Sequence, residues 1–353
     1  MLTLFRSREA NAFQEFIMEA RTWWAVQLFP RLREEYEVRK QLAEREGRRV
    51  RSAEDVAALF SRSTLYAYFC WLERHVQKSK YSSSRWGLVA QIAREPETAA
   101  ERLKAGGSLE LDPALRVPDY YAAHDIHQHP GNLHGDANAG LVYEASALSI
   151  HPKTKKNELH ERFVDLVRRE GEFAHVLDMG CGFGKSTVPL AHAFPKAKVV
   201  GVDVSAPCLK LAAADARNLS NVNFRQADAR HTGLEAEKFD LVTSTMLLHE
   251  LPEESVDATL AETRRLLAPG GVSIHLDFRT EDPFWQFVMY GHSERNNEPF
   301  LAPLIRMDLA AAYRKAGFEE VRIEPFAERE GATDPSNPFW RFPWAAIIAR
   351  KPA

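Results

Sequence analysis

The residues with the clearest chemical potential lie in one glycine-rich stretch. His175-Val-Leu-Asp-Met-Gly-Cys-Gly-Phe-Gly-Lys-Ser186 leads from an apolar run through Gly180, Gly182 and Gly184 into a helical pattern. Glycine permits positive φ and close approach of the backbone to a ligand, and the next helix begins with free N–H groups. The spacing Gly-x-Gly-x-Gly differs from the dinucleotide fingerprint and lacks the longer gap of a P-loop. The stretch therefore predicts a ligand-binding turn of another kind.

Three acidic residues indicate which ligand this turn serves. Asp178 stands two residues before the first glycine, where a carboxylate repels a pyrophosphate but suits an ammonium group. Asp203 closes the next apolar run and could accept hydrogen bonds from both hydroxyls of a ribose. Asp228 ends the run after that and could face the amino group of an adenine. A ligand with an ammonium group, a ribose and an adenine but no phosphate is S-adenosylmethionine.

The elements that must position these residues alternate between strand and helix. Strand-like apolar runs cover residues 175–179, 198–202, 222–226, 239–244 and 272–276, and helical patterns lie between them. Such alternation favours βαβ units and a parallel sheet that is covered on both faces. The predicted fold is therefore α/β, with a Rossmann-like, mostly parallel sheet, plus a mainly helical N-terminal domain.

The region from about Tyr143 to Pro352 resembles a class I S-adenosylmethionine-dependent methyltransferase of the small-molecule type. Several blocks occur in the family's order: the glycine block, Asp203, Asp228, Phe239-Asp-Leu-Val-Thr-Ser-Thr-Met-Leu-Leu-His-Glu-Leu251, Leu266-Leu-Ala-Pro-Gly-Gly271, Ala316-Gly-Phe318 before Val321-Arg-Ile-Glu324, and the closing run 345–349. The resemblance implies a seven-stranded sheet whose last strand is antiparallel. It also implies cofactor contacts by Tyr143, Asp178, Gly180, Gly182, Gly184, Asp203, Val204, Asp228, Ala229 and Thr245.

His249 is the candidate catalytic residue. The stretch Leu247-Leu-His-Glu-Leu-Pro-Glu-Glu-Ser255 is similar to the block that carries the base histidine of small-molecule O-methyltransferases. Those enzymes usually have Asp-Trp after the histidine, whereas this chain has Glu250-Leu251. A hydroxyl acceptor needs a base, and histidine is suited to that role near neutral pH. The alternative is a histidine that only packs under the cofactor.

Two further segments could shape the acceptor pocket. The connector from Tyr120 to Asp136 is rich in histidine, and we expect His124, His127 and His129 to contact substrate. The alternatives are ordinary loop and interface packing and, more weakly, a metal site, because the spacing of the histidines matches no zinc pattern. The long insertion 277–303 carries aromatic residues, and Tyr290 and His292 are expected to bind substrate. Its helix could instead simply pack on the N-terminal domain.

Helical periodicity dominates the first part of the chain. Pro30 is expected to end or kink the first helix, and Ser52 precedes an acidic pair and an apolar run, as a helix N-cap does. The predicted domains are residues 1–115, a helical lid that could also form a homodimer; 116–152, a connector that contributes to the active site; and 153–353, the catalytic domain.

The composition and charge of the chain limit the kinds of partner and location that it can have. The 353 residues carry 46 Lys and Arg against 49 Asp and Glu, a net charge of −3, which argues against nucleic-acid binding. No apolar run is long enough to span a membrane. The three cysteines and the charged first ten residues are typical of a cytoplasmic protein.

The predicted function is methyl transfer to a small-molecule acceptor, with a hydroxyl as the preferred group. The alternatives are an N-, C- or S-methyltransferase, a nicotinamide-dependent oxidoreductase and a non-catalytic cofactor-binding subunit. Asp178 and the glycine spacing disfavour the oxidoreductase, and the intact glycine and acidic blocks disfavour the non-catalytic subunit.

Overall fold

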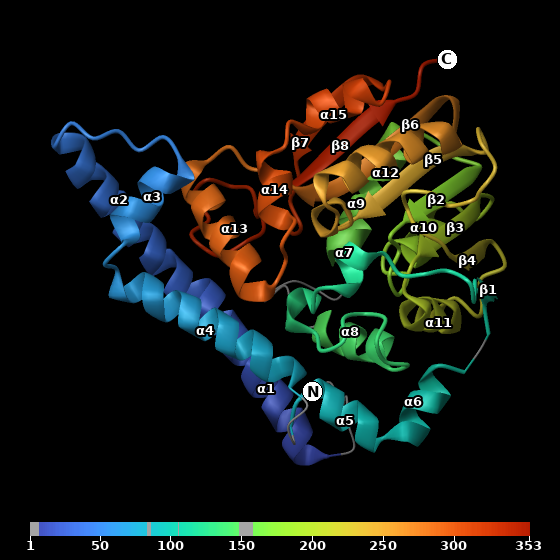
Figure 1. Cartoon of the computed structure of the whole chain (residues 1–353), viewed down its shortest axis with the longest axis horizontal. Coiled ribbons are helices and arrows are strands. Elements are labelled where there is room, and N and C mark those ends of the chain that lie inside the picture. Colours follow the sequence, from blue (N-terminus) through green and yellow to red (C-terminus); the bar gives the residue numbers. More distant parts are fainter. Residues whose placement is uncertain (1–6, 83–85, 105, 148–157) are drawn as a thin grey trace.

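A single twisted sheet organises the C-terminal part of the protein (Figure 1). The computed structural model describes residues 7–82, 86–104, 106–147 and 158–353. Within these residues the sheet has eight strands in the order β1-β4-β3-β2-β5-β6-β8-β7. The strands are β1 (Ser108–Glu110), β2 (His175–Met179), β3 (Lys198–Asp203), β4 (Val222–Gln226), β5 (Phe239–Thr245), β6 (Leu267–Phe278), β7 (Glu319–Pro325) and β8 (Trp344–Arg350).

The predicted α/β class is confirmed, with one strand more than the seven expected. The β8 strand runs antiparallel to both β6 and β7, and the other pairs of neighbours are parallel. The additional strand is the short β1, which pairs with β4 at one edge of the sheet. The central strand β2 sets Asp178 beside Gly201 of β3 and beside Thr243 of β5, so the ends of these three strands meet at one place.

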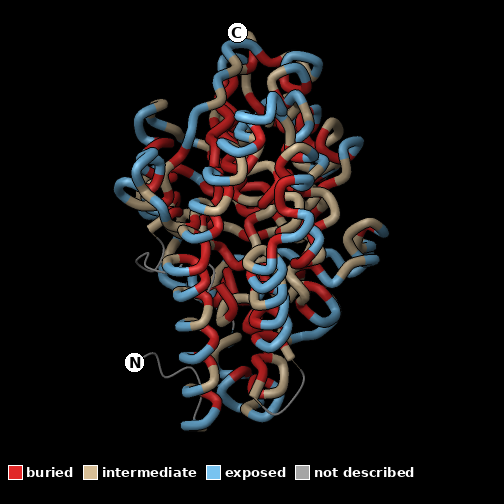
Figure 2. The backbone as a smooth tube through the Cα atoms, turned by 90° about the vertical axis from the view of Figure 1, so that its left-hand side faces the viewer, coloured by how far each residue is buried: buried red, intermediate tan, exposed pale blue. Residues whose placement is uncertain are grey.

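Helices cover both faces of the sheet because successive strand residues point to opposite sides. Val176 packs into one buried cluster with residues of α9 (Glu158–Glu170) and α10 (Thr187–Ala193). Leu177 packs into another with residues of α12 (Glu253–Leu266) and α15 (Leu309–Lys315). Figure 2 shows the buried backbone concentrated in the interior and the exposed turns outside. The helices of this part are α9 (Glu158–Glu170), α10 (Thr187–Ala193), α11 (Ala206–Asp215), η3 (Leu248–Glu250), α12 (Glu253–Leu266), α13 (Pro283–Asn296), α14 (Leu301–Arg306) and α15 (Leu309–Lys315).

The N-terminal part of the chain is helical, apart from β1. Its elements are α1 (Arg8–Trp23), η1 (Trp24–Leu28), α2 (Phe29–Arg45), α3 (Ala53–Phe60), α4 (Thr64–Tyr81), α5 (Leu88–Arg94), α6 (Pro96–Arg102), α7 (Asp119–Ala122), η2 (Ile126–Gln128) and α8 (Ala139–Ala147). A π-helical segment, η1, joins α1 to α2, and Pro30 lies in the first turn of α2. Ser52 caps α3 in a capping box with Asp55, as its position predicted.

Aromatic side chains join the N-terminal helices to the insertion after β6. Tyr36 stacks on Phe284 with ring centroids 4.6 Å apart, and Phe60 stacks on Phe287 at 5.4 Å. Figure 1 accordingly shows α13 beside α2, α3 and α4. The insertion helix α13 therefore packs on the N-terminal helices. This was the alternative to a helix that lines the acceptor pocket. No described helix is both long enough and apolar enough to cross a membrane.

Candidate functional site

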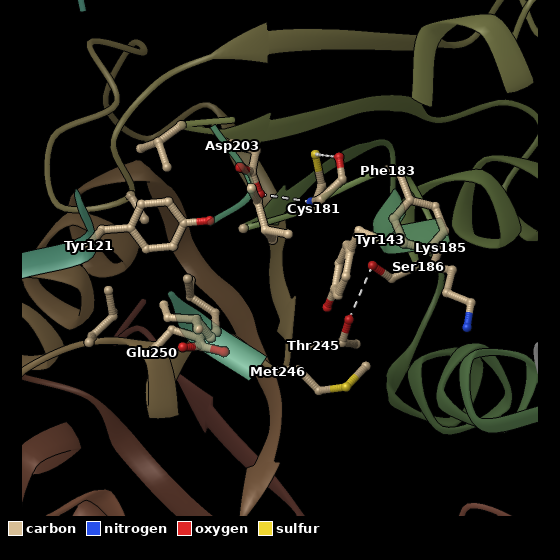
Figure 3. A pocket seen from close by; sticks show the side chains of 18 of the residues that line it. Tyr121, Tyr143, Cys181, Phe183, Lys185, Ser186, Asp203, Thr245, Met246 and Glu250 are labelled. Carbon is tan, nitrogen blue, oxygen red and sulfur yellow. Dashed lines mark hydrogen bonds between the residues drawn. The ribbon is translucent and has the colours of Figure 1, made fainter. Parts of the chain in front are cut away.

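A pocket opens where β2, β3, β4 and β5 end, as expected for an open α/β sheet (Figure 3). The connector closes it from the opposite side through Tyr121, His127 and Tyr143. The sequence-predicted residues that line it are Tyr143, Gly180, Gly182, Asp203, Val204, Asp228, Ala229, Thr245 and His127. Other lining residues include Tyr120, His160, Phe183, Lys185, Ser186, Met246, Leu247, Glu250 and Leu251.

The glycine turn forms one wall of this pocket. Gly180 and Gly182 have φ of +65° and +52°, a region that side chains other than glycine rarely adopt. A Cβ on Gly182 would meet nothing within 4 Å, so the pocket side of this residue is open. Gly184 does not line the pocket: a Cβ there would lie 3.2 Å from that of Ala212, so this glycine serves helix packing.

Asp203 is placed to bind hydroxyl groups. Its Oδ2 accepts a hydrogen bond from the Gly182 N–H at 2.8 Å, and its Oδ1 accepts one from the Ser205 N–H at 2.8 Å. Each carboxylate oxygen has further acceptor capacity, and the side chain borders the pocket. Burial raises the pKa of Asp203, which these two backbone donors oppose. The carboxylate therefore suits the ribose of S-adenosylmethionine.

Asp228 occupies the end of β4, where an adenine is expected. Arg230 holds it from the side, with Nε at 3.1 Å from each carboxylate oxygen and Nη2 at 2.6 Å from Oδ2. The Arg230 guanidinium also lies 5.0 Å from the centre of the Tyr120 ring. This pairing fixes the Asp228 carboxylate beside Ala229 at the pocket wall, so the acids and glycines that line the pocket fit the parts of the cofactor.

Asp178 does not reach the pocket, contrary to the expected contact with an ammonium group. It is fully buried, and Oδ2 accepts hydrogen bonds from the hydroxyls of Ser186 and Thr187, both at 2.6 Å. Its Oδ1 accepts one from Thr243 at 3.2 Å. The carboxylate thus ties β2 to the residues after the glycine turn and to β5, and supports the pocket from behind.

We expect Asp178→Asn to change the pH dependence of stability. Burial raises the pKa of Asp178 to about 6, above the unfolded value of about 3.9, so its contribution is complete at low pH and declines as the pH rises through 6. The cost at pH 7 is on the order of 3 kcal/mol. Asparagine carries no such cost, so urea unfolding should show a smaller loss of stability between pH 4 and 7 than in the unsubstituted chain. An unchanged slope would contradict this role.

His249 is held away from the pocket by ion pairs. It is 3% exposed and is not a lining residue. Its Nδ1 lies 2.8 Å from Asp277 Oδ1, and its Nε2 lies 3.3 Å from Glu250 Oε1. Although burial disfavours the charged form, these carboxylates raise the pKa of His249 well above its usual value. Both ring nitrogens contact carboxylates and the residue does not line the pocket, so this geometry gives no support to the predicted role of His249 as the base.

Glu250 is the acidic residue of the pocket that sequence reasoning missed. Its Oε1 lies 3.3 Å from Nε2 of both His127 and His249. Its Oε2 is buried and has no hydrogen-bond partner among the described residues. Figure 3 shows the Glu250 carboxylate on the side of the pocket that Tyr121 closes. The only sequence signal was its position next to His249.

Of the five predicted substrate residues, only His127 lines the pocket. His127 has φ of +57°, its ring is stacked with that of Tyr143 at 6.1 Å, and its Nδ1 lies 2.9 Å from Glu298. The other four lie elsewhere: His124 packs on Phe300, His129 on Tyr81 and Tyr290 under Arg306, while His292 pairs with Glu73. His129 and His292 are buried, whereas His124 and Tyr290 are partly buried; sequence spacing could not show that all four side chains point away from the pocket.

A search of the described part of the chain finds no group of three histidine, cysteine or acidic side chains arranged to hold a metal ion. The histidine-rich connector instead uses His127 in ion pairs with carboxylates and His129 in aromatic packing. The metal alternative therefore has no geometric support within those residues.

Sequence comparisons match part of this chain to methyltransferases. A family model described as a methyltransferase domain matches residues 176–271. A demethylmenaquinone methyltransferase of Lactiplantibacillus plantarum is 30% identical over 177 residues, covering 43% of this chain and 73% of that protein. A trans-aconitate 2-methyltransferase of Deinococcus radiodurans is 41% identical over 103 residues, covering 29% of this chain and 37% of that protein.

Among solved structures, a phosphoethanolamine N-methyltransferase 2 of Haemonchus contortus, in complex with S-adenosylhomocysteine, matches with a TM-score of 0.43 and 20% identity. The match covers 54% of this chain and 52% of that one. The family model, the sequence relatives and the pocket at the strand ends lead to one assignment. The chain belongs to the class I S-adenosylmethionine-dependent methyltransferases.

Proposed function

We propose that this enzyme transfers a methyl group to a hydroxyl oxygen of a small-molecule acceptor, and that Glu250 receives the hydroxyl proton. The observation that carries the proposal is that Glu250 lines the pocket while its buried Oε2 has no hydrogen-bond partner among the described residues. A buried carboxylate oxygen without a donor is costly, and an acceptor hydroxyl would supply that donor.

The residues proposed to hold the cofactor are those at the strand ends. Asp203 would accept the ribose hydroxyls, Asp228 and Ala229 would border the adenine, and the turn at Gly180 and Gly182 would lie against the backbone of the ligand. When bound, the cofactor supplies a methyl group on a sulfonium, which is already activated for in-line displacement. The protein's contribution is therefore chiefly positioning and the removal of the acceptor proton.

Two histidines contact Glu250 and orient its carboxylate. His127 and His249 both approach Oε1, which leaves Oε2 for the acceptor. Although burial disfavours the charged form, the carboxylates of Glu298 and Glu250 raise the pKa of His127, and those of Asp277 and Glu250 raise the pKa of His249. A hydroxyl oxygen becomes strongly acidic as it forms its new bond to carbon. A carboxylate is therefore a sufficient base for a proton that leaves during the transfer.

We also propose roles for the predicted domains. The connector 116–152 would close the acceptor side through Tyr121, His127 and Tyr143 and exclude water from the reacting atoms. Residues 1–115 would hold the connector in place, because Gln77 of α4 donates a hydrogen bond to the backbone oxygen of His127 at 2.8 Å. The boundary between 152 and 153 lies outside the described residues.

A homodimer and a cytoplasmic location stay predictions from the sequence.

The acceptor atom can be tested with matched acceptors. The protein would be incubated with methyl-labelled S-adenosylmethionine and sets of aromatic compounds that differ only in a hydroxyl, amino or thiol group. We expect labelled methyl ethers from the hydroxyl members of the sets. Transfer that occurs only to nitrogen, sulfur or carbon would contradict the proposal and leave the corresponding alternative.

A further inference from the structure

Two cationic side chains are buried behind the connector without a direct counter-ion. Arg21 of α1 is 6% exposed and Lys80 of α4 is 3% exposed. The Arg21 guanidinium lies over the Trp24 ring at 5.1 Å, and the Lys80 ammonium lies over the Tyr81 ring at 4.6 Å. Neither side chain has a hydrogen bond or an ion pair to any described residue, and Arg21 Nη1 is a buried donor without an acceptor.

A third unpartnered group lies against the same tyrosine. The His129 ring packs edge-on against Tyr81, with ring centroids 5.0 Å apart. The residue is almost fully buried, and neither ring nitrogen finds a partner in the described ranges. Burial, followed by the charge of His127, lowers the pKa of His129 to about 4, so the ring is neutral at pH 7 and carries one free N–H.

The nearby carboxylates already contact other side chains. Glu73 is paired with Arg295 and His292, and Glu298 is paired with His127. Burial and then the nearby charge of Arg21 lower the pKa of Lys80 well below its usual value, and a bound anion would oppose both effects. Two neighbouring buried cations without a contacting anion are unfavourable in a low-dielectric interior. An oxyanion would satisfy both cations and the free N–H groups together.

We propose that Arg21, Lys80 and His129 bind an anionic group, a carboxylate or a phosphate, on the methyl acceptor. This inference rests on the proposed function, since it assigns the acceptor's second anchoring point. The place is suitable because the same elements reach the pocket: Tyr81 donates a hydrogen bond to Ser146 of α8, the helix that carries Tyr143. His129 follows two residues after His127, which contacts Glu250. The acceptor is thus an acid whose hydroxyl faces Glu250.

The experiment measures anion binding separately from cofactor binding. Benzoate, phenyl phosphate and the neutral benzamide are titrated by calorimetry into protein saturated with S-adenosylhomocysteine. We expect one of the two anions to bind at least tenfold more tightly than benzamide, and a preference between them identifies the anionic group. Arg21→Met and Lys80→Met should each weaken that anion at least tenfold. Lys78→Met, at an exposed position on the same helix, should not change it.

The controls separate this inference from the proposed function. Unchanged affinity for S-adenosylhomocysteine in each variant shows that the fold and the cofactor site are intact, and Arg21→Lys should retain part of the anion affinity. Equal binding of benzamide and both anions, no anion binding at all, or anion affinity that survives Arg21→Met and Lys80→Met would overturn the inference. Methyl transfer to a neutral hydroxyl acceptor would still support the proposed function in that case.

Discussion

Glu250→Gln should lower kcat for methyl transfer by about 100-fold or more, the range typical for loss of a general base. Glutamine has nearly the same shape and keeps an oxygen toward His127 and His249, but its nitrogen cannot accept the acceptor proton. The affinity for S-adenosylhomocysteine should stay within about twofold, because in our proposal Glu250 faces the acceptor and Asp203 binds the cofactor. The measurement is a steady-state assay with an acceptor found in the labelled-methyl screen.

The matched control is Glu253→Gln, which removes a neighbouring carboxylate from an exposed position on α12. It should leave kcat unchanged. If Glu250→Gln retains more than about a third of kcat, Glu250 is not the proton acceptor, since a base of this kind contributes far more. His249→Gln provides a further comparison: it should lower kcat less than Glu250→Gln does, because His249 acts only through Glu250 and Asp277.

Glu73→Gln should destabilise the protein by about 3–5 kcal/mol, the usual cost of leaving one member of a buried ion pair without its partner. The Glu73 side chain is fully buried and contacts Arg295 Nε and His292 Nδ1. Although burial opposes its ionisation, the contacts with Arg295 and His292 hold the pKa of Glu73 well below its usual value. Glutamine would leave the Arg295 guanidinium buried between α4 and α13 without a counter-ion. Urea unfolding at pH 7 measures the loss.

The pH dependence supplies a second readout. Because the folded-state pKa of Glu73 is lowered, its contribution is present above the unfolded value near 4.5 and is lost as the pH falls below it. Glu73→Gln should therefore lose less stability than the unsubstituted chain on acidification. The exposed Glu19→Gln on α1 should change little. The double variant Glu73→Gln with Arg295→Met should recover part of the loss. A loss below about 1 kcal/mol in the single variant would contradict this account.

Most strands of the sheet could be predicted because a buried strand is a short, continuous run of apolar residues in the sequence. The strand expected at 175–179 is β2 itself, since a strand that is covered on both faces reads as a continuous apolar run. The strand β1 was missed because Ser108–Glu110 is only three residues long and is largely exposed. Its pairing with β4 depends on contacts between residues more than 100 positions apart, which no local pattern reports.

Most of the residues predicted to contact the cofactor lie together around the pocket, whereas four of the five predicted to contact substrate do not. The spacing of the glycines and of the acidic residues relative to the strands is enough to place them at the turn and at the strand ends. The partners of His249 and His127 are Asp277, Glu250 and Glu298, two of which come from distant segments. Asp178 shows the converse case: its spacing placed it at the turn, but three hydroxyl donors turn its carboxylate away from the pocket.

The most direct test of the central claim is a calorimetric titration with S-adenosylhomocysteine of the intact chain and of Asp203→Ala. We predict binding in the micromolar range or tighter for the intact chain. The variant should bind at least about tenfold more weakly, because hydrogen bonds to a charged group contribute about 1.5–3 kcal/mol. The absence of binding by the intact chain, or equal affinity in Asp203→Ala, would contradict the placement of the cofactor at the ends of β2, β3 and β4.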